Sequence, residues 1–359
     1  VKGGLSPWLF ANAKVSKASE KYELVSTQEF HSLEGEVSGE GPVGSLLHFA
    51  GSDKFLAKEV SEVVEKRAVV KEGTVENGLH MHKHEVFSIN DLHEYPGYKW
   101  AMAIDMNKCT GCNDCIVSCN VENNIPVVGK NQVNKGREMH WMRIDRYFKG
   151  STTNVKAVFQ PMLCQHCDNA PCENVCPVVA TAHSPEGLND MAYNRCVGTR
   201  YCANNCPYKV RRFNFYNFRN SVGRPKNNEW AGKGFYENKS VELMHNPEVT
   251  VRSRGVMEKC SFCVQRIYEA KQKAKEQGRV VRDGDVVTAC QSACPANAII
   301  FGNINDAHSQ IRKWANSDLN YKVLEEINVR PNVNYLAKLR YEDSVVKTDH
   351  KETPGGGHH

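Results

Sequence analysis

The sequence predicts an α+β fold in which a strand, a cysteine-rich turn and a short helix recur along one chain. Two observations carry this prediction. The 15 cysteines of the 359 residues are gathered into four runs instead of being spread out. A short alternating apolar segment accompanies each run, and an order that repeats in this way marks an internal repeat. The strands are expected at 99–105, 155–159, 189–194 and 298–302.

The spacing of the cysteines indicates the chemistry that they can support. Runs two, three and four each end in Cys-Pro, and the spacings within the runs are typical of the iron-sulfur ligand pattern C-x2-C-x2-C-x3-C-P. A compact turn of this kind directs several thiolates at one point. The runs are Cys109, Cys112, Cys115 and Cys119; Cys164, Cys167, Cys172 and Cys176; Cys196, Cys202 and Cys206; and Cys260, Cys263, Cys290 and Cys294.

Thr199 stands where the third run lacks its second cysteine, midway between Cys196 and Cys202. Three complete sets of four thiolates and one incomplete set predict three [4Fe-4S] clusters and one [3Fe-4S] cluster. A hydroxyl of Thr199 that binds a fourth iron is the alternative, although threonine binds iron poorly unless it is deprotonated. We expect the incomplete cluster to have a higher reduction potential than its neighbours, because cluster type and charge set the potential.

The runs have to act in pairs. In two-cluster ferredoxins the last cysteine of each run binds the other cluster. In run four a helix expected at 264–278 separates Cys263 from Cys290, and such an excursion can return its ends to one place. We therefore expect two pseudo-symmetric ferredoxin-like modules, binding four iron-sulfur clusters, at 99–305. Long irregular extensions are expected on both sides of the modules. Residues 46–98 would form a linker, and residues 306–359 would form a tail that wraps around a partner or around the core of this chain.

Zinc and disulfides are the alternative uses of these cysteines. C-x2-C pairs also build zinc sites, but such sites usually present two separated pairs for each metal, whereas run one has four closely spaced cysteines. Disulfides would leave one of the 15 cysteines unpaired. The cysteine content, about 4%, is also low for a disulfide scaffold.

The remaining composition narrows the function classes. The net charge of +5 is too small to indicate a nucleic-acid partner, and no apolar stretch approaches the roughly 18 residues of a membrane span. Neither a G-x-G-x-x-G stretch after a strand nor a P-loop occurs, and no catalytic residue is predicted. Four clusters without a substrate site are typical of an electron-transfer protein, because each cluster passes single electrons.

Three smaller signals accompany the cysteine runs. His80, His82 and His84 alternate, which suits the exposed face of an extended segment better than a metal site. His166 lies between two cysteines of run two, where it either donates a hydrogen bond to a sulfur or fills space. The basic and aromatic segment 209–218 suggests RNA binding, but its place after run three favours packing on the module and docking to a membrane partner.

With these runs the chain resembles, over residues 98–305, the four-cluster electron-transfer subunits of molybdopterin oxidoreductases such as dimethyl sulfoxide, polysulfide and nitrate reductases. Within that group it is most similar to the iron-sulfur region of the B subunit of alternative complex III, a bacterial quinol oxidoreductase. The likeness extends to segments outside the runs, at 22–35, 93–100, 122–130 and 324–331.

The resemblance implies a specific set of ligands. Run one would pair with run four and run two with run three, and Thr199 would face the vacant corner of the last cluster. The implied ligand sets are Cys109, Cys112, Cys115 and Cys294; Cys119, Cys260, Cys263 and Cys290; Cys164, Cys167, Cys172 and Cys206; and Cys176, Cys196 and Cys202.

The resemblance also implies a setting for the chain. Residues 1–45 would end a molybdopterin-like domain of the same polypeptide, so that this chain would be the C-terminal portion of a longer product. Electrons would enter from a quinol site in a polytopic membrane subunit, beside the incomplete cluster, and leave toward multihaem and monohaem cytochrome c subunits. The location implied is peripheral, at the periplasmic face of the bacterial inner membrane.

Two other functions compete with this one. The chain could serve a true molybdopterin reductase, in which electrons flow to a cofactor that reduces a terminal acceptor. Molybdenum in the purified complex would favour that function, and c-type haems would favour alternative complex III. A structural zinc module is the competitor from another class, and about four zinc ions per chain without acid-labile sulfide would establish it.

Overall fold

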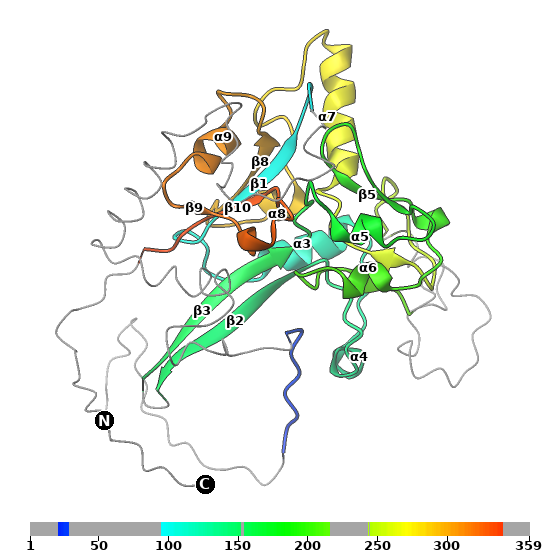
Figure 1. Cartoon of the computed structure of the whole chain (residues 1–359), viewed down its shortest axis with the longest axis vertical. Helices are drawn as coiled ribbons and strands as arrows, with labels where there is room; N and C mark the ends of the chain where they lie inside the picture. Colours follow the sequence, from blue (N-terminus) through cyan, green and yellow to red (C-terminus); the bar gives the residue numbers. More distant parts are fainter. Residues whose placement is uncertain (1–20, 29–94, 152–153, 216–242, 244, 340–359) are drawn as a thin grey trace, which may run out of the picture.

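The computed structural model describes residues 21–28, 95–151, 154–215, 243 and 245–339 (Figure 1). Its centre is a four-stranded sheet in the order β8-β1-β10-β9. The strands are β1 (Trp100–Asp105), β8 (Ile299–Asn303), β9 (Asn320–Tyr321) and β10 (Val333–Leu336). β1 pairs in parallel with β10 and antiparallel with β8, and all six of its residues are buried, as expected of an interior strand.

The two faces of β1 pack against different layers. Ala101 and Ala103 face the short helix α9 (Gln310–Ala315), whose Ile311 is fully buried against them. The capping hydroxyl of Ser309 accepts a hydrogen bond from the backbone N–H of Arg312 and starts this helix. On the opposite face, β1 contributes to the main core, which also contains most of the buried cysteines.

The C-terminal part differs from the predicted irregular tail. β10 lies inside the central sheet between β1 and β9, and Tyr335 is fully buried. Asn334 is a polar residue in this buried strand. Its burial is tolerated because its side chain donates a hydrogen bond to the carbonyl oxygen of Met102 at 3.3 Å. Residues up to 339 therefore belong to the same core as the cysteine runs, and 340–359 lie outside the described residues.

Short helices position the buried cysteines of the runs. These helices are α3 (Asp114–Glu122), α5 (Pro171–Asn174), α6 (Tyr201–Asn204) and α8 (Ala289–Ser292). The long hairpin of β2 (Met142–Ser151) and β3 (Asn154–Leu163) leads into run two and extends from the body in Figure 1. The remaining elements are α4 (Lys130–Asn134), β4 (Thr181–His183), β5 (Asn189–Met191), η4 (Tyr193–Arg195), β6 (Arg212–Phe213), β7 (Met257–Glu258) and η6 (Glu325–Ile327).

The insertion in run four is a helix, as predicted. α7 (Val264–Glu276) buries Ile267, Ala270 and Ala274, which fall on one face at helical spacing. It ends two residues before the left-handed Gly278, and the chain returns to α8. The predicted strands at 99–105, 155–159 and 298–302 correspond to β1, β3 and β8, while 189–194 forms β5 and then the 3-10 turn η4.

Several N-terminal predictions lie outside the described residues. These are the linker at 46–98, except for 95–98, and the string His80, His82 and His84. Of the domain end predicted at 1–45, only 21–28 is described, as an extended segment whose Gln28 side chain donates to the carbonyl oxygen of Arg146. Within the described residues no helix has the length and apolar character needed to cross a membrane.

Candidate iron-sulfur sites

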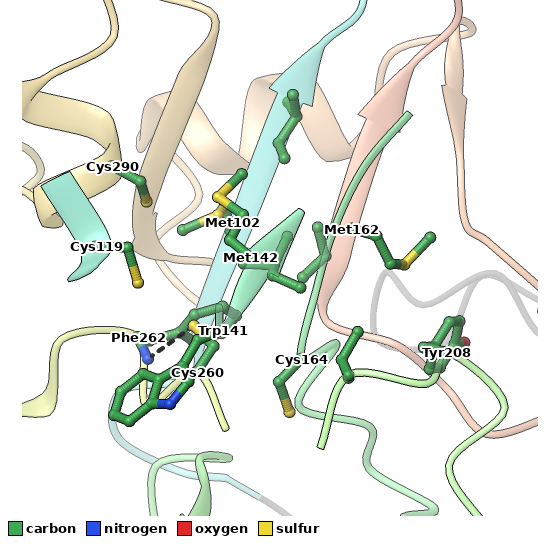
Figure 2. Close-up of a cluster of buried hydrophobic side chains, with 14 of the residues drawn as sticks. Met102, Cys119, Trp141, Met142, Met162, Cys164, Tyr208, Cys260, Phe262 and Cys290 are labelled. Atoms are coloured by element: carbon green, nitrogen blue, oxygen red, sulfur yellow. Dashed lines mark hydrogen bonds between the residues drawn. The ribbon is translucent and has the colours of Figure 1, made fainter. Parts of the chain in front are cut away.

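All four C-x2-C positions share one backbone turn. The residue before the second ligand position has a left-handed conformation in every run: φ is 70° at Gly111, 45° at His166, 74° at Gly198 and 55° at Phe262. The turn at Phe262 aims its N–H at the sulfur of Cys260, 3.4 Å away (Figure 2). Thr199 therefore follows a left-handed residue, as do the cysteines at the corresponding position of the other three runs.

Two cavities are lined by the cysteines of runs two and three. One is bordered by Cys164, Cys167, Cys172 and Cys206, which we call group C. The other is bordered by Cys176, Cys196 and Cys202, which we call group D. Thr199 lines the cavity of group D, together with its neighbour Gly198. In each group, cysteines of one run meet a single cysteine from the other run.

The cysteines of runs one and four exchange partners in the same way. The thiol of Cys109 is close enough to Cys294 and Cys112 for their charges to raise its pKa. The charges of the same two residues also raise the pKa of Cys115. The pKa of the Cys119 thiol is raised instead by the charges of Cys260, Cys263 and Cys290, in addition to its burial. We call Cys109, Cys112, Cys115 and Cys294 group A, and Cys119, Cys260, Cys263 and Cys290 group B. The pairing of the runs is thus present in the fold.

The buried thiols of these groups lose their protons only with the help of a cation. Burial, and then the neighbouring thiols, together raise the pKa of Cys115 to about 12. Burial likewise raises the pKa of Cys263 and Cys172 to about 12. Buried thiols that oppose one another's ionisation become thiolates when a metal binds them. The residues of the four groups fit clusters that contain iron.

Backbone and side-chain donors already point at several sulfurs. The N–H of Ala180 donates to Cys176 at 3.1 Å, and burial is outweighed by such backbone donors, which lower the pKa of that thiol. Equivalent donors are Ala298 for Cys294 at 3.3 Å, Ala289 for Cys263 at 3.4 Å and Met257 for Cys196 at 3.4 Å. Hydrogen bonds to sulfur stabilise the thiolate and contribute to cluster potential.

The four groups follow one another in the order A, B, C, D. Cys290 of group B raises the pKa of Cys115 in group A, and Cys164 of group C raises that of Cys260 in group B. The charges of Cys172 in group C and Cys202 in group D both act on one side chain, Arg211. Figure 2 shows Cys119, Cys260 and Cys290 of group B and Cys164 of group C among buried side chains of the main core.

Exposure of the cysteines changes along this order. All four cysteines of group B are buried, as are all but Cys206 of group C. In the end groups, Cys112 of group A is exposed, and Cys109, Cys294, Cys176 and Cys196 are partly exposed. The two ends of the series are therefore accessible to other molecules, and its middle is enclosed.

His166 binds backbone groups, whereas the sequence left open whether it donates to a sulfur or fills space. Its ring is fully buried, and burial holds its pKa well below the ordinary value, so the imidazole is neutral. Nδ1 accepts from the N–H of Asn189 at 3.0 Å, which leaves Nε2 to donate to the carbonyl oxygen of Cys260 at 3.0 Å. Both ring nitrogens thus bind backbone groups, and the side chain connects groups C and B.

Three side chains near the sulfurs escaped prediction. The hydroxyl of Thr288 lies 3.2 Å from the sulfur of Cys290. The ammonium of Lys259 is buried and bonds to the carbonyl oxygens of Asn189 and Cys260. Arg211 is buried beside groups C and D. Arg211 belongs to the basic segment after run three, and this was the one feature of the sequence that could have drawn attention to it. A run of basic residues, however, usually indicates an exposed surface.

That basic and aromatic segment packs on the module as predicted, for the part of it that is described. Arg212 forms an ion pair with Glu138, and the rings of Phe213 and Phe215 meet edge to face at 4.6 Å. Arg200, from the ligand turn of Thr199, lies over the ring of Phe213 at 4.6 Å. Tyr216 and Phe218 lie outside the described residues.

The cysteines are free thiols that stand apart from one another. All 15 cysteines are described and none forms a disulfide. Among the described residues no three His, Cys, Asp or Glu side chains converge as closely as one metal ion requires. A zinc ion would hold its sulfurs at about 2.3 Å, whereas a cluster of several irons keeps its ligands further apart.

The chain is similar to known iron-sulfur proteins. Two 4Fe-4S dicluster domain models match, one at residues 108–180 and the other at 155–219, and together they contain runs one to three. The menaquinone reductase iron-sulfur cluster-binding subunit of Nitratidesulfovibrio vulgaris is 38% identical over 248 residues, which are 68% of this chain and 90% of that protein.

Two further relatives cover similar portions. The Hdr-like menaquinol oxidoreductase iron-sulfur subunit 1 of Archaeoglobus fulgidus is 33% identical over 67% of this chain and 84% of its own length. The putative dimethyl sulfoxide reductase iron-sulfur subunit of Halobacterium salinarum is 32% identical over 66% of this chain and 78% of its own length.

Proposed function

We propose that this chain, which belongs to the family of iron-sulfur electron-transfer subunits of menaquinone and molybdopterin oxidoreductases, conducts single electrons along groups A to D between two partner proteins. When bound, each cluster accepts and releases one electron at a time. The observation that carries the proposal is the order of the four groups, with an enclosed middle and accessible ends. Partners can exchange electrons at the ends, while the enclosed middle excludes other reactants.

We assign one [4Fe-4S] cluster each to groups A, B and C and a [3Fe-4S] cluster to group D. The assignment is supported by the presence of Thr199 on a ligand turn of group D. A side-chain hydroxyl is a weak ligand for iron, so this corner of the cluster is expected to lack its iron. His166 is assigned a supporting role, since its nitrogens bind backbone groups and not a cluster.

The proposed electron donor is a quinol bound by a polytopic membrane subunit, and the proposed place is the periplasmic face of the bacterial inner membrane. Two of the relatives carry menaquinone or menaquinol in their names, which supports quinol chemistry. Exposed Val179, Val197 and Tyr201 surround the group D end and offer an apolar surface for such a subunit. Electrons then leave at group A.

The acceptor at group A has two candidates. The relative named as a dimethyl sulfoxide reductase subunit supports a molybdopterin-dependent catalytic subunit. The second candidate is a set of c-type cytochromes, as in alternative complex III together with a molybdopterin-like domain. It is favoured by the likeness outside the cysteine runs, for example at 93–100 and 324–331.

Purification of the complex tests the function. Low-temperature EPR is expected to show a near-isotropic [3Fe-4S] signal in the oxidised sample that disappears on reduction, with [4Fe-4S] signals appearing. Molybdenum analysis and haem spectra then decide between the two acceptors. If the complex contains zinc and lacks both iron and acid-labile sulfide, the electron-transfer function is overturned. If the [3Fe-4S] signal is missing, the assignment of group D is overturned.

A further inference from the structure

Arg211 is a buried cation without an acidic partner. Only 5% of the surface of Arg211 is exposed to solvent. Two other buried arginines are neutralised: Arg143 bonds to Asp145 at 2.7 Å and Arg252 to Glu258 at 2.9 Å. Among the residues that the structure describes, no carboxylate lies within the 4.0 Å of an ion pair with Arg211. Burial of an unpaired charge is costly, so a negative group has to be supplied.

The guanidinium lies between the two cavities. Nη2 donates to the hydroxyl of Thr181 at 2.7 Å and lies 3.6 Å from the sulfur of Met191, and both residues line the cavity of group D. Arg211 itself lines the cavity of group C. Its Nε and Nη1 are buried and have no hydrogen-bond partner among the described residues. Two of its polar atoms therefore remain available on a side chain that borders both sites.

The electrostatics agree with this placement. Burial alone would lower the pKa of Arg211, but the charges of Cys172, Cys202, Cys164 and Cys206 raise it above the ordinary value. In return, Arg211 opposes the effect of burial on the pKa of Cys172 and Cys202. The guanidinium is thus close to the cysteines of both groups, as its place between the two cavities requires.

We propose that Arg211 tunes the reduction potentials of the group C and group D clusters, by donating Nε–H and Nη1–H to sulfur in group C and placing its charge between the two. Each reduction adds one negative charge to a cluster, and a buried cation stabilises that charge with little screening. Loss of Arg211 therefore lowers both potentials. The inference rests on the proposed function, since it requires clusters in these two groups.

Redox-poised EPR on the purified complex tests the proposal with three variants. Arg211→Met removes both charge and donors, and Arg211→Lys keeps the charge while removing the planar fork of donors. Lys209→Met removes the same charge two residues away at an exposed position, where water and salt screen it. Iron and sulfide contents are measured alongside, so that each potential refers to a chain with all its clusters.

For Arg211→Met we expect the reduction equilibrium constants of two centres, one of them the [3Fe-4S] centre, to fall about tenfold, or 59 mV for a one-electron couple. The other two centres should stay at their wild-type potentials. Arg211→Lys should lower the reduction equilibrium constant of the group C centre by a smaller factor, about threefold, and Lys209→Met should leave all four potentials unchanged.

Unchanged potentials in a fully loaded Arg211→Met protein would overturn the proposal, as would an equal shift from Lys209→Met. If Arg211→Met does not fold, an unchanged group C potential in Arg211→Lys overturns the role of the donors. Absence of iron or of EPR signals from the wild-type complex would instead reject the proposed function, so the two failures are distinguishable.

Discussion

His166 donates a hydrogen bond from Nε2 to the carbonyl oxygen of Cys260, 3.0 Å away, because its Nδ1 is already occupied by the N–H of Asn189. The ring also stacks on Phe262 with 3.8 Å between centroids. One neutral side chain thus holds the ligand turn of group C against the ligand turn of group B. We expect the spacing of the two enclosed groups to depend on this contact.

Replacement of His166 by phenylalanine should destabilise the junction of groups B and C. His166→Phe keeps a ring against Phe262 but leaves the buried N–H of Asn189 without this partner and the carbonyl oxygen of Cys260 with only the hydrogen bond from Lys259, at a cost of about 2 kcal/mol. His166→Ala should cost more, because it adds a cavity. The rate of thermal unfolding, followed by loss of visible cluster absorbance, measures the effect. His140→Phe is the control, since it removes the contact of a half-buried imidazole with Asn120 at 2.8 Å. Equal losses from the two phenylalanine variants would contradict this role of His166.

Thr199→Cys should convert group D into a four-thiolate site. Thr199 already lines the cavity of group D and follows a left-handed residue, as the cysteines at this position of the other runs do, so a cysteine side chain should reach the cavity. We expect the [3Fe-4S] signal of the oxidised sample to disappear, a fourth [4Fe-4S] signal to appear on reduction, and quinol oxidation to slow. Thr199→Ala should keep the wild-type spectrum. A changed spectrum in Thr199→Ala would mean that the hydroxyl binds iron.

Gly198→Ala should disrupt group D selectively. A Cβ at this position would overlap the carbonyl oxygen of Gly255, and φ is +74°. Gly278→Ala is a matched control, because its φ of +64° brings similar backbone strain while nothing lies within 4 Å of the added methyl. The control should cost about 1 kcal/mol. Gly198→Ala should cost several times more and reduce the [3Fe-4S] signal relative to the other clusters. Similar losses in both variants would argue against the close approach of the two backbones.

The ion pair between Glu122 and Arg266 should couple α3 to α7 in a pH-dependent manner. Arg266 donates Nε to Oε1 at 2.9 Å and Nη2 to Oε2 at 2.7 Å. These bonds lower the pKa of Glu122 in the folded chain, so the stabilisation is present above the ordinary glutamate pKa of about 4.3 and is lost as pH falls through the lower folded value.

A double-mutant cycle of Glu122→Gln and Arg266→Met, read from unfolding rates near neutral pH, should give a coupling of about 1 kcal/mol, because the pair is bidentate and partly buried. The exposed pair of Glu269 and Lys273 on the same helix is the control, with about 0.4 kcal/mol expected. Coupling that is already lost at or above the ordinary glutamate pKa would contradict the lowered pKa of Glu122.

The local parts of the fold were predictable from the sequence. Cysteine spacing located the four ligand turns, and the helix-like stretch at 264–278 within run four located α7. The place of β10 was not predictable, because Val333–Leu336 is a short segment whose parallel partner β1 lies more than half the chain away. Such pairing depends on tertiary structure, which no local pattern records.

The candidate sites were predictable in their ligands but not in their surroundings. The cysteines and Thr199 stand out by spacing alone. Lys259 and Arg211 look like surface charges in the sequence, and only the packing around them places them in the interior. The role of His166 depends on which backbone groups reach its two nitrogens, and these come from segments 23 and 94 positions away.

The position of β10 also affects how the chain is made. The carbonyl of Met102 accepts its hydrogen bond from the side chain of Asn334, 232 positions later, so β1 leaves the ribosome long before its parallel partner exists. Cys109 follows β1 almost immediately, while Cys294 of the same group precedes β10 by only some forty residues of synthesis. The ligands of group A therefore cannot assemble before Cys294 has been translated, and a chain truncated before β10 would leave one edge of β1 unpaired.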